Sequence, residues 1–223
     1  MCAVVLRRPK NQPKSAAAVR GARRAPYPGF IAPCDPVLRE QAPDGPQWLH
    51  EIKIDGYRAQ LHLRAGRATI YSRRGYDWTR QFRVIAEAAQ ALSAHELIAD
   101  GEASVLGRTG LPDFQALRRE LAKDRSERLS YQAFDLLYLD GYDLRDAPLL
   151  ERKRALERIL AKVLPQLSYV DFLELEDGET VYRRRSPGGR AGCSSITCGT
   201  DAARLRSAPI RRERDPAFRW RHQ

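Results

Sequence analysis

The chain has 223 residues, of which 43% are hydrophobic, enough to bury the core of one large or two small domains. No apolar run reaches membrane-spanning length, the N-terminal residues do not resemble a secretory signal, and the four cysteines are expected to be free thiols in a reducing compartment. The net charge of +11 belongs to the two ends, because residues 1–25 hold seven Lys/Arg and no acid and residues 183–223 hold eleven Lys/Arg against three acids. The middle of the chain is therefore mildly acidic, and the basic character typical of nucleic-acid binding is confined to the ends.

Composition and periodicity divide the chain into three regions. Residues 1–28 are rich in Arg, Ala and Pro and predict a basic disordered arm. Residues 29–182 carry strand and helix patterns and form the candidate globular domain. Residues 183–223 lose the apolar period and predict an Arg-rich irregular tail.

Within the candidate domain, polar and apolar residues alternate over 50–63, which predicts a half-buried strand with Glu51, Lys53 and Asp55 on one face. The run 67–75 is expected to pair with it as a hairpin around 64–66. Further along, the patterns predict helices over 80–93, 112–121 and 147–163, and strands over 96–106, 129–141 and 169–178. Hairpins with interposed helices predict an α+β fold of mixed, largely antiparallel sheets with flanking helices, and they argue against a doubly wound parallel sheet.

The segment His-Glu-Ile-Lys-Ile-Asp-Gly-Tyr-Arg at 50–58 is the most informative part of the chain. Spacing alone is equally compatible with a solvated strand edge of mixed charge. However, its K-x-D-G-x-R pattern resembles the nucleotidyl-lysine motif of ATP-dependent DNA ligases and mRNA capping enzymes.

Further landmarks of the ligase family follow in the family's order. The run 71–79 resembles the S-R-x-G-x-D-x-T segment, 100–102 is similar to the D-G-E segment, and 134–141 resembles the strand whose aromatic residue stacks on adenine. Upstream, 30–33 and 48–51 add to the likeness. The chain most resembles the ligase domain of the bacterial ligase D type, which acts in end joining.

The resemblance implies a chemistry and a set of site residues. A lysine amine would attack the α-phosphorus of ATP, with Mg²⁺ or Mn²⁺, to form lysyl-AMP for sealing nicked or broken double-stranded DNA, with end-joining factors as further partners. A free lysine has a pKa near 10.4, so such an amine must be activated by burial and neighbouring cations. The resemblance also implies a cytoplasmic, nucleoid-associated bacterial protein. The implied roles are Lys53 as nucleophile, Glu51 at the adenine or ribose edge, Arg58 and Arg73 on ribose or phosphate, Glu102 as ribose or metal ligand, and Phe134 as stacking face.

Each of these segments also has a purely structural interpretation. Arg73 and Arg74 would form a solvated turn, and Phe134 in an apolar strand would be core. The run 100–102 could be a bulge with two exposed acids, and 77–79 a helix cap with a packed Trp. His50 and His62 fall on a predicted strand and need no catalytic role.

The C-terminal part departs from the family pattern. The family continues with an E-G-x-x-x-K segment, a K-x-K segment and an oligonucleotide-binding barrel, but Lys162 is the last lysine of this chain. We therefore expect 29–182 to be a partial adenylation domain without a barrel, and we interpret 183–223 as the product of a shifted reading frame, or else a native basic tail. Complete nick sealing would then be impaired. The alternatives are an RNA ligase or capping-type nucleotidyltransferase, and a catalytically dead nucleic-acid-binding remnant.

Overall fold

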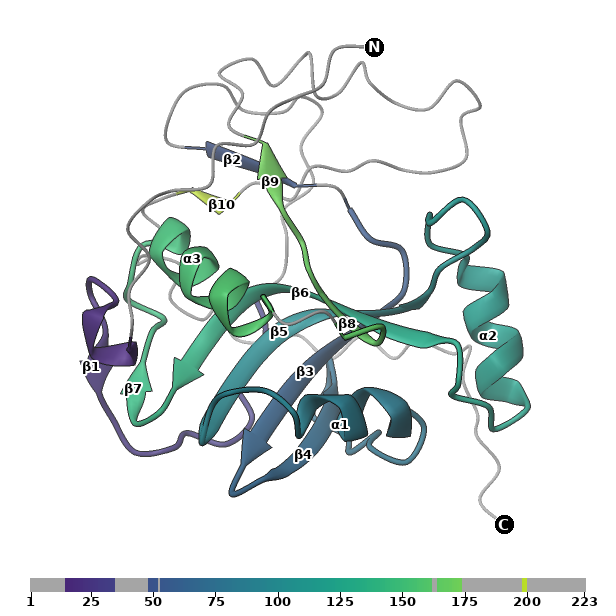
Figure 1. Ribbon diagram of the computed structural model, residues 1–223, viewed down its shortest axis with the longest axis horizontal. Coiled ribbons are helices and arrows are strands. Elements are labelled where there is room, and N and C mark those ends of the chain that lie inside the picture. Colours follow the sequence, from purple (N-terminus) through teal and green to yellow (C-terminus); the bar gives the residue numbers. More distant parts are fainter. Residues whose placement is uncertain (1–14, 35–47, 52, 162–163, 174–197, 200–223) are drawn as a thin grey trace.

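A seven-stranded, mainly antiparallel sheet carries most of the described part of the chain, with strand order β1-β7-β6-β5-β3-β4 and β8 paired to β6 (Figure 1). The computed structural model describes residues 15–34, 48–51, 53–161, 164–173 and 198–199. The predicted α+β class with largely antiparallel sheets is confirmed, because β6 with β8 is the parallel pair among the described strands. The strands of this sheet are β1 (Arg23–Arg24), β3 (Tyr57–Arg64), β4 (Arg67–Ser72), β5 (Glu96–Val105), β6 (Leu129–Leu139), β7 (Tyr142–Asp143) and β8 (Leu167–Tyr169).

The predicted hairpin between β3 and β4 is present and turns where expected. Arg64 faces Arg67 at the end of the ladder, and Ala65 and Gly66 take positive φ values of 47° and 73° in the turn. Strand β3 also pairs along its whole length with β5, so that Arg58 lies opposite Glu102 and Gln60 opposite Asp100. This register gathers polar residues of two strands on one face of the sheet.

The two faces of the sheet differ in chemistry because side chains alternate along each strand. On β3, Ala59, Leu61 and Leu63 join the main buried cluster, whereas Gln60 and His62 are buried on the opposite face. The main cluster also takes in residues of every α-helix, including Ile85, Ala89, Leu117, Ala155 and Leu156.

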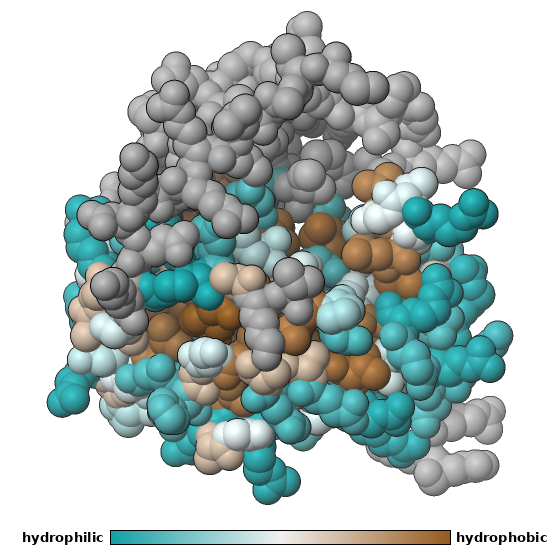
Figure 2. All heavy atoms as spheres, in the orientation of Figure 1, coloured by the Kyte–Doolittle hydropathy of each residue, from teal (hydrophilic) through white to brown (hydrophobic). Residues whose placement is uncertain are grey.

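The described residues form three α-helices, α1 (Arg83–Ala89), α2 (Phe114–Ala122) and α3 (Leu149–Ile159). Helices α1 and α3 are shorter than the predicted ranges that contain them, and α2 ends one residue beyond the predicted 112–121. Asp113 is the N-cap residue of α2, and its side chain accepts a hydrogen bond of 2.8 Å from the Ala116 N–H. On the face shown in Figure 2, apolar residues gather near the middle and hydrophilic residues around the rim. Within the described residues, no helix is long and apolar enough to cross a membrane.

A second, three-stranded sheet consists of β2 (Trp48–Glu51), β9 (Phe172–Leu173) and β10 (Cys198–Gly199). The prediction of one strand over 50–63 is therefore wrong: its two halves lie in different sheets, and Lys53 and Asp55 lie between them outside any strand. Gly56 marks the break, because a Cβ there would lie 2.2 Å from the Ala103 carbonyl oxygen. Alternation alone could not show that the chain changes sheets.

The N-terminal region differs from the predicted disordered arm over residues 15–28. A short 3-10 helix (Ala16–Ala18) buries Ala16, Val19 is 2% exposed in the main cluster, and β1 pairs with β7. Apolar residues among the arginines explain this packing. Residues 1–14, 174–178 of the predicted last strand, and 183–223 apart from the backbone of 198–199 lie outside the described part of the chain.

Candidate active site

The segment 53–55 connects the two sheets and carries the lysine of the motif. Lys53 and Asp55 are exposed there, and Ile54 is half-buried. A Cβ at Gly56 would meet Cγ of Glu102 at 3.0 Å as well as the Ala103 backbone, so only glycine lets this segment cross β5 so closely. The motif glycine thus brings Lys53 towards the acidic residue of β5.

Glu102 lies half-buried on β5, opposite Arg58. Burial raises the pKa of its carboxyl to about 7; the charges of Arg58 and Lys53 act to lower it, and those of Asp100 and Asp55 act to raise it. The charge of Lys53 thus favours the ionised form of this carboxyl. A partly desolvated carboxylate near a lysine is suited to bind a cation or the hydroxyls of a sugar.

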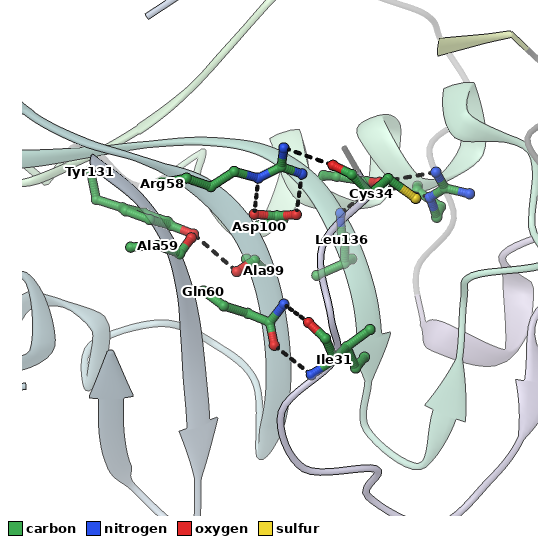
Figure 3. A network of polar contacts seen from close by, with 11 residues as sticks. Ile31, Cys34, Arg58, Ala59, Gln60, Ala99, Asp100, Tyr131 and Leu136 are labelled. Atoms are coloured by element: carbon green, nitrogen blue, oxygen red, sulfur yellow. Dashed lines mark hydrogen bonds and ion pairs between the residues drawn. The ribbon is translucent and has the colours of Figure 1, made fainter. Parts of the chain in front are cut away.

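Arg58 and Asp100 form a two-point ion pair beside Glu102 (Figure 3). Nε of Arg58 donates to Oδ1 of Asp100 at 3.1 Å, Nη2 donates to Oδ2 at 2.8 Å, and Nη1 donates to the carbonyl oxygen of Cys34 at 3.0 Å. Asp100 is 4% exposed, so the interpretation of 100–102 as a bulge with two exposed acids is wrong for this residue, although the ladder to β6 does shift there. The pairing locks the guanidinium in place.

Phe134, on β6, lies under this guanidinium: Cζ of Arg58 is 5.2 Å from the centroid of its ring. The ring is half-buried and so differs from the plain core interpretation. An arginine held over an aromatic ring makes a favourable cation–π contact and keeps the ring oriented.

Glu51 ends β2, two residues before Lys53, and its carboxylate forms an ion pair with the fully buried Lys153 of α3. Burial raises the pKa of the Glu51 carboxyl, and the charge of Lys153 and its hydrogen bond act to lower it. The implied contact of Glu51 with adenine or ribose stays a prediction, and the structure gives its carboxylate a partner that the sequence did not indicate.

A strap formed by residues 27–34 covers the polar face of β3 next to the ion pair (Figure 3). Gln60 exchanges two hydrogen bonds with the backbone of Ile31, 3.0 Å from its N–H and 2.9 Å to its carbonyl oxygen. His62 is held between the Tyr27 hydroxyl at Nδ1 and the Gln60 amide oxygen, 2.8 Å from Nε2. Burial lowers the pKa of His62 to about 4, which favours the neutral imidazole at neutral pH. Its two hydrogen bonds hold the strap against β3, and the expectation that it needs no catalytic role stays a prediction.

The segment after β4 reaches the site through its backbone. The Arg73 N–H donates to the carbonyl oxygen of Arg58 at 3.1 Å, while the Arg73 side chain is exposed. The packed interpretation of 77–79 is confirmed for Trp78, whose ring contacts Tyr57 and Phe82, but Asp77 accepts from the Thr79 N–H in a turn and does not cap α1. The roles of Arg58 and Arg73 on ribose or phosphate stay predictions.

Comparison with known proteins decides the family. Residues 36–184, more than half of the chain, match the family described as "ATP dependent DNA ligase domain". This chain belongs to the ATP-dependent DNA ligases. The matched range contains each of the site residues from Glu51 to Lys153.

Individual ligases of this family resemble the chain over part of their length. The "Multifunctional non-homologous end joining protein LigD" of Pseudomonas aeruginosa is 39% identical over 158 residues, covering 68% of this chain and 19% of that protein. A "Probable DNA ligase" of Mycobacterium sp. (strain KMS) is 37% identical over 139 residues, covering 60% of this chain and 26% of that protein. A solved structure of "mycobacterial DNA ligase D complexed with ATP and MES" superposes with a TM-score of 0.49 at 33% identity, covering 61% of this chain and 43% of that one. The chain thus spans less than half the length of these relatives.

Four of the six predicted ligase residues are linked to one another, since Arg58 contacts Phe134 and the charges of Arg58 and Lys53 act on Glu102. Arg73 reaches Arg58 only through its backbone N–H, and Glu51 pairs with Lys153. The sequence did not single out Asp100 and Lys153. Asp100 was visible only as the first letter of the D-G-E landmark, and its pairing with Arg58 depends on the β3–β5 register. Lys153 was hidden in an ordinary amphipathic helix pattern. The helical spacing was a signal for it, because Arg152 and Lys153 fall on the same buried face of α3 as Leu149 and Leu156.

Proposed function

We propose that this chain carries out the first step of ligation, transfer of AMP from ATP to Lys53. The Nζ lone pair of Lys53 attacks the α-phosphorus, an N–P bond forms, the P–O bond to pyrophosphate breaks, and the amine gives up a proton. One observation supports this proposal most: in this member of the ATP-dependent DNA ligases, Lys53 is exposed on the segment that connects the two sheets, where its charge acts on Glu102.

The neighbouring residues support distinct parts of this step. The ring of Phe134 offers a stacking face for adenine, and Arg58 lies beside it with its charge fixed by Asp100. An unpaired Glu51 carboxylate would disfavour the neutral form of the Lys53 amine, but this carboxylate is paired with Lys153. Arg73 lies on an exposed turn, where its guanidinium can reach a phosphate or ribose of the nucleotide.

The described residues would supply one carboxylate, that of Glu102, to a Mg²⁺ or Mn²⁺ ion. No group of three or more His, Cys, Asp and Glu among them forms a ready-made metal site. Mg²⁺ in phosphate chemistry commonly keeps waters and uses one or two carboxylates together with substrate phosphates, and Glu102 supplies one such carboxylate in an acidic neighbourhood. When bound, the ion would neutralise phosphate charge during the transfer.

We further propose that the acceptor of AMP is a nicked or broken double-stranded DNA end in the bacterial cytoplasm, in concert with end-joining factors. The family assignment supports DNA rather than an RNA cap or RNA end as the substrate class.

Intact-mass spectrometry tests the first step. After incubation with ATP and Mg²⁺ the protein should gain one AMP, GTP should give no comparable adduct, and added pyrophosphate should remove it by reversal. Sealing of a nicked duplex is the separate test of the complete reaction. An adduct with GTP but not ATP would overturn the proposal in favour of capping-type chemistry.

A further inference from the structure

Lys153 is the feature of the structure that the ligation chemistry leaves unexplained. It lies in the middle of α3 with 0% of its surface exposed. Lysine is almost never fully buried unless its charge is paired. The burial of Lys153 therefore requires partners that compensate its charge.

The ammonium group of Lys153 uses all three of its donors. It pairs with the Glu51 carboxylate and donates to the carbonyl oxygens of Phe134 at 3.0 Å and Val170 at 3.2 Å. The rings of Tyr169 and Phe172 lie 5.1 and 5.7 Å from it. An ammonium group has no lone pair, and Nζ of Lys153 directs its donors at three protein acceptors, so Lys153 is not placed to act as a second nucleophile.

The three acceptors come from elements that build the site. Glu51 ends β2 two residues before Lys53, and Phe134 on β6 provides the ring under Arg58. In Figure 1, α3 lies between the small sheet that contains β2 and the large sheet that contains β6. One side chain therefore ties the strand that leads to the nucleophile to the backbone of the stacking residue.

The preceding residue strengthens the same connection. Arg152 donates from Nε and Nη2 to the two carboxylate oxygens of Asp135, at 2.8 and 3.0 Å, and from Nη1 to the Ala147 carbonyl oxygen at 2.6 Å. Asp135 directly follows Phe134, where the β5–β6 ladder shifts register. Adjacent cations of α3 thus hold adjacent residues of β6.

We propose that Lys153 is a positioning residue for adenylation: it sets the distance between Lys53 and the Phe134 stacking face by holding Glu51 and the Phe134 backbone at once. This inference rests on the proposed function. Because misplacement of a reacting group by about 1 Å can cost on the order of 100-fold in rate, a residue that never touches ATP can control the transfer.

The test compares the full chain carrying Glu51→Gln with the double variant Glu51→Gln/Lys153→Met. The double variant has no buried charge at this position, whereas Glu51→Gln leaves the Lys153 ammonium with the carbonyl oxygens of Phe134 and Val170 but without its carboxylate. Glu51→Gln should therefore be the less stable of the two, which acts against the expected order of rates, and circular dichroism checks that both variants are folded. Any direct contact of the Glu51 carboxylate with nucleotide is lost equally in both. The rate of AMP transfer is measured against ATP concentration. We expect the double variant to be slower than Glu51→Gln by about 10-fold to 100-fold, with a raised KM for ATP.

A stability control separates positioning from simple destabilisation. Leu117→Ala removes a fully buried side chain from α2, which contacts neither Glu51 nor Phe134 through any described hydrogen bond. At a temperature well below its melting point it should transfer AMP at the wild-type rate. Equal rates for Glu51→Gln and the double variant would overturn the positioning role, as would a loss in Leu117→Ala as large as the further loss of the double variant relative to Glu51→Gln.

The two proposals fail in different ways. A wild-type chain that forms no AMP adduct refutes the proposed function. Equilibrium binding of ATP, followed without catalysis, then decides on Lys153: weaker binding in the double variant than in Glu51→Gln supports positioning of the pocket, and equal binding, or none in either, overturns it.

Discussion

The ion pair between Arg58 and Asp100 gives the sharpest prediction about stability. Replacing Arg58 by Met leaves the Asp100 carboxylate, 4% exposed, without the two hydrogen bonds at 3.1 and 2.8 Å that it now accepts. Removing one partner of a buried pair costs about 3–5 kcal/mol. The Arg58 side chain is 20% exposed, so we expect a loss near the lower end, about 3 kcal/mol, and a fall in melting temperature of about 10 °C.

Urea denaturation followed by circular dichroism at neutral pH measures this loss, and two variants frame it. Arg58→Met/Asp100→Asn removes both charges and should recover at least half of the lost free energy of unfolding. Arg64→Met breaks a pair on the same strand whose arginine is 62% exposed, and it should cost about 1 kcal/mol or less. Two results would refute this prediction: a loss in Arg58→Met no larger than that in Arg64→Met, or a loss in Arg58→Met/Asp100→Asn as large as that in Arg58→Met alone.

Three further predictions follow from particular contacts. The pKa of His62 is lowered to about 4 in the folded chain, so between about pH 6.5 and 4 the unfolded chain binds one more proton than the folded chain. The free energy of unfolding should therefore fall by up to about 3 kcal/mol as the pH drops over that range. The difference in this free energy between wild type and His62→Asn should change over the same range, and a constant difference would contradict the prediction. A Cβ at position 101 would lie 2.5 Å from Cζ of Tyr131, so Gly101→Ala should lower the free energy of unfolding by about 3 kcal/mol in urea titrations, and a loss below about 1 kcal/mol would show that the ring moves aside. Phe134→Leu keeps an apolar side chain but removes the stacking face, so ATP binding measured by calorimetry should weaken about tenfold, whereas unchanged affinity would place adenine elsewhere.

The sequence predicted the large sheet well because its strands alternate cleanly. The hairpin at 64–66, the strands over 96–106 and 129–141 and all three helices were found within a few residues of their positions. It failed where alternation continued across a change of sheet: 50–63 kept a period of two although Gly56 approaches the Ala103 backbone and the chain leaves one sheet for the other. A period reports local exposure, not which strand lies alongside.

The family landmarks supplied the candidate site residues, but no pattern in the sequence supplied the contacts between them. The family landmarks indicated Lys53, Arg58, Glu102 and Phe134 in order. That Arg58 pairs with Asp100 depends on the register between β3 and β5, and that Glu51 pairs with Lys153 depends on α3 docking between two sheets. Such pairings between distant residues are set by tertiary structure, which no local pattern contains.

Tandem mass spectrometry of the ATP-treated protein tests the central claim most directly, by locating the AMP. Within the described residues the lysines are Lys53, Lys123 and Lys153, of which Lys123 is exposed at the end of α2 and Lys153 is fully buried. The account predicts AMP on Lys53, its loss in Lys53→Arg and its full retention in Lys123→Arg. AMP on another lysine, or an adduct that survives Lys53→Arg, would contradict it.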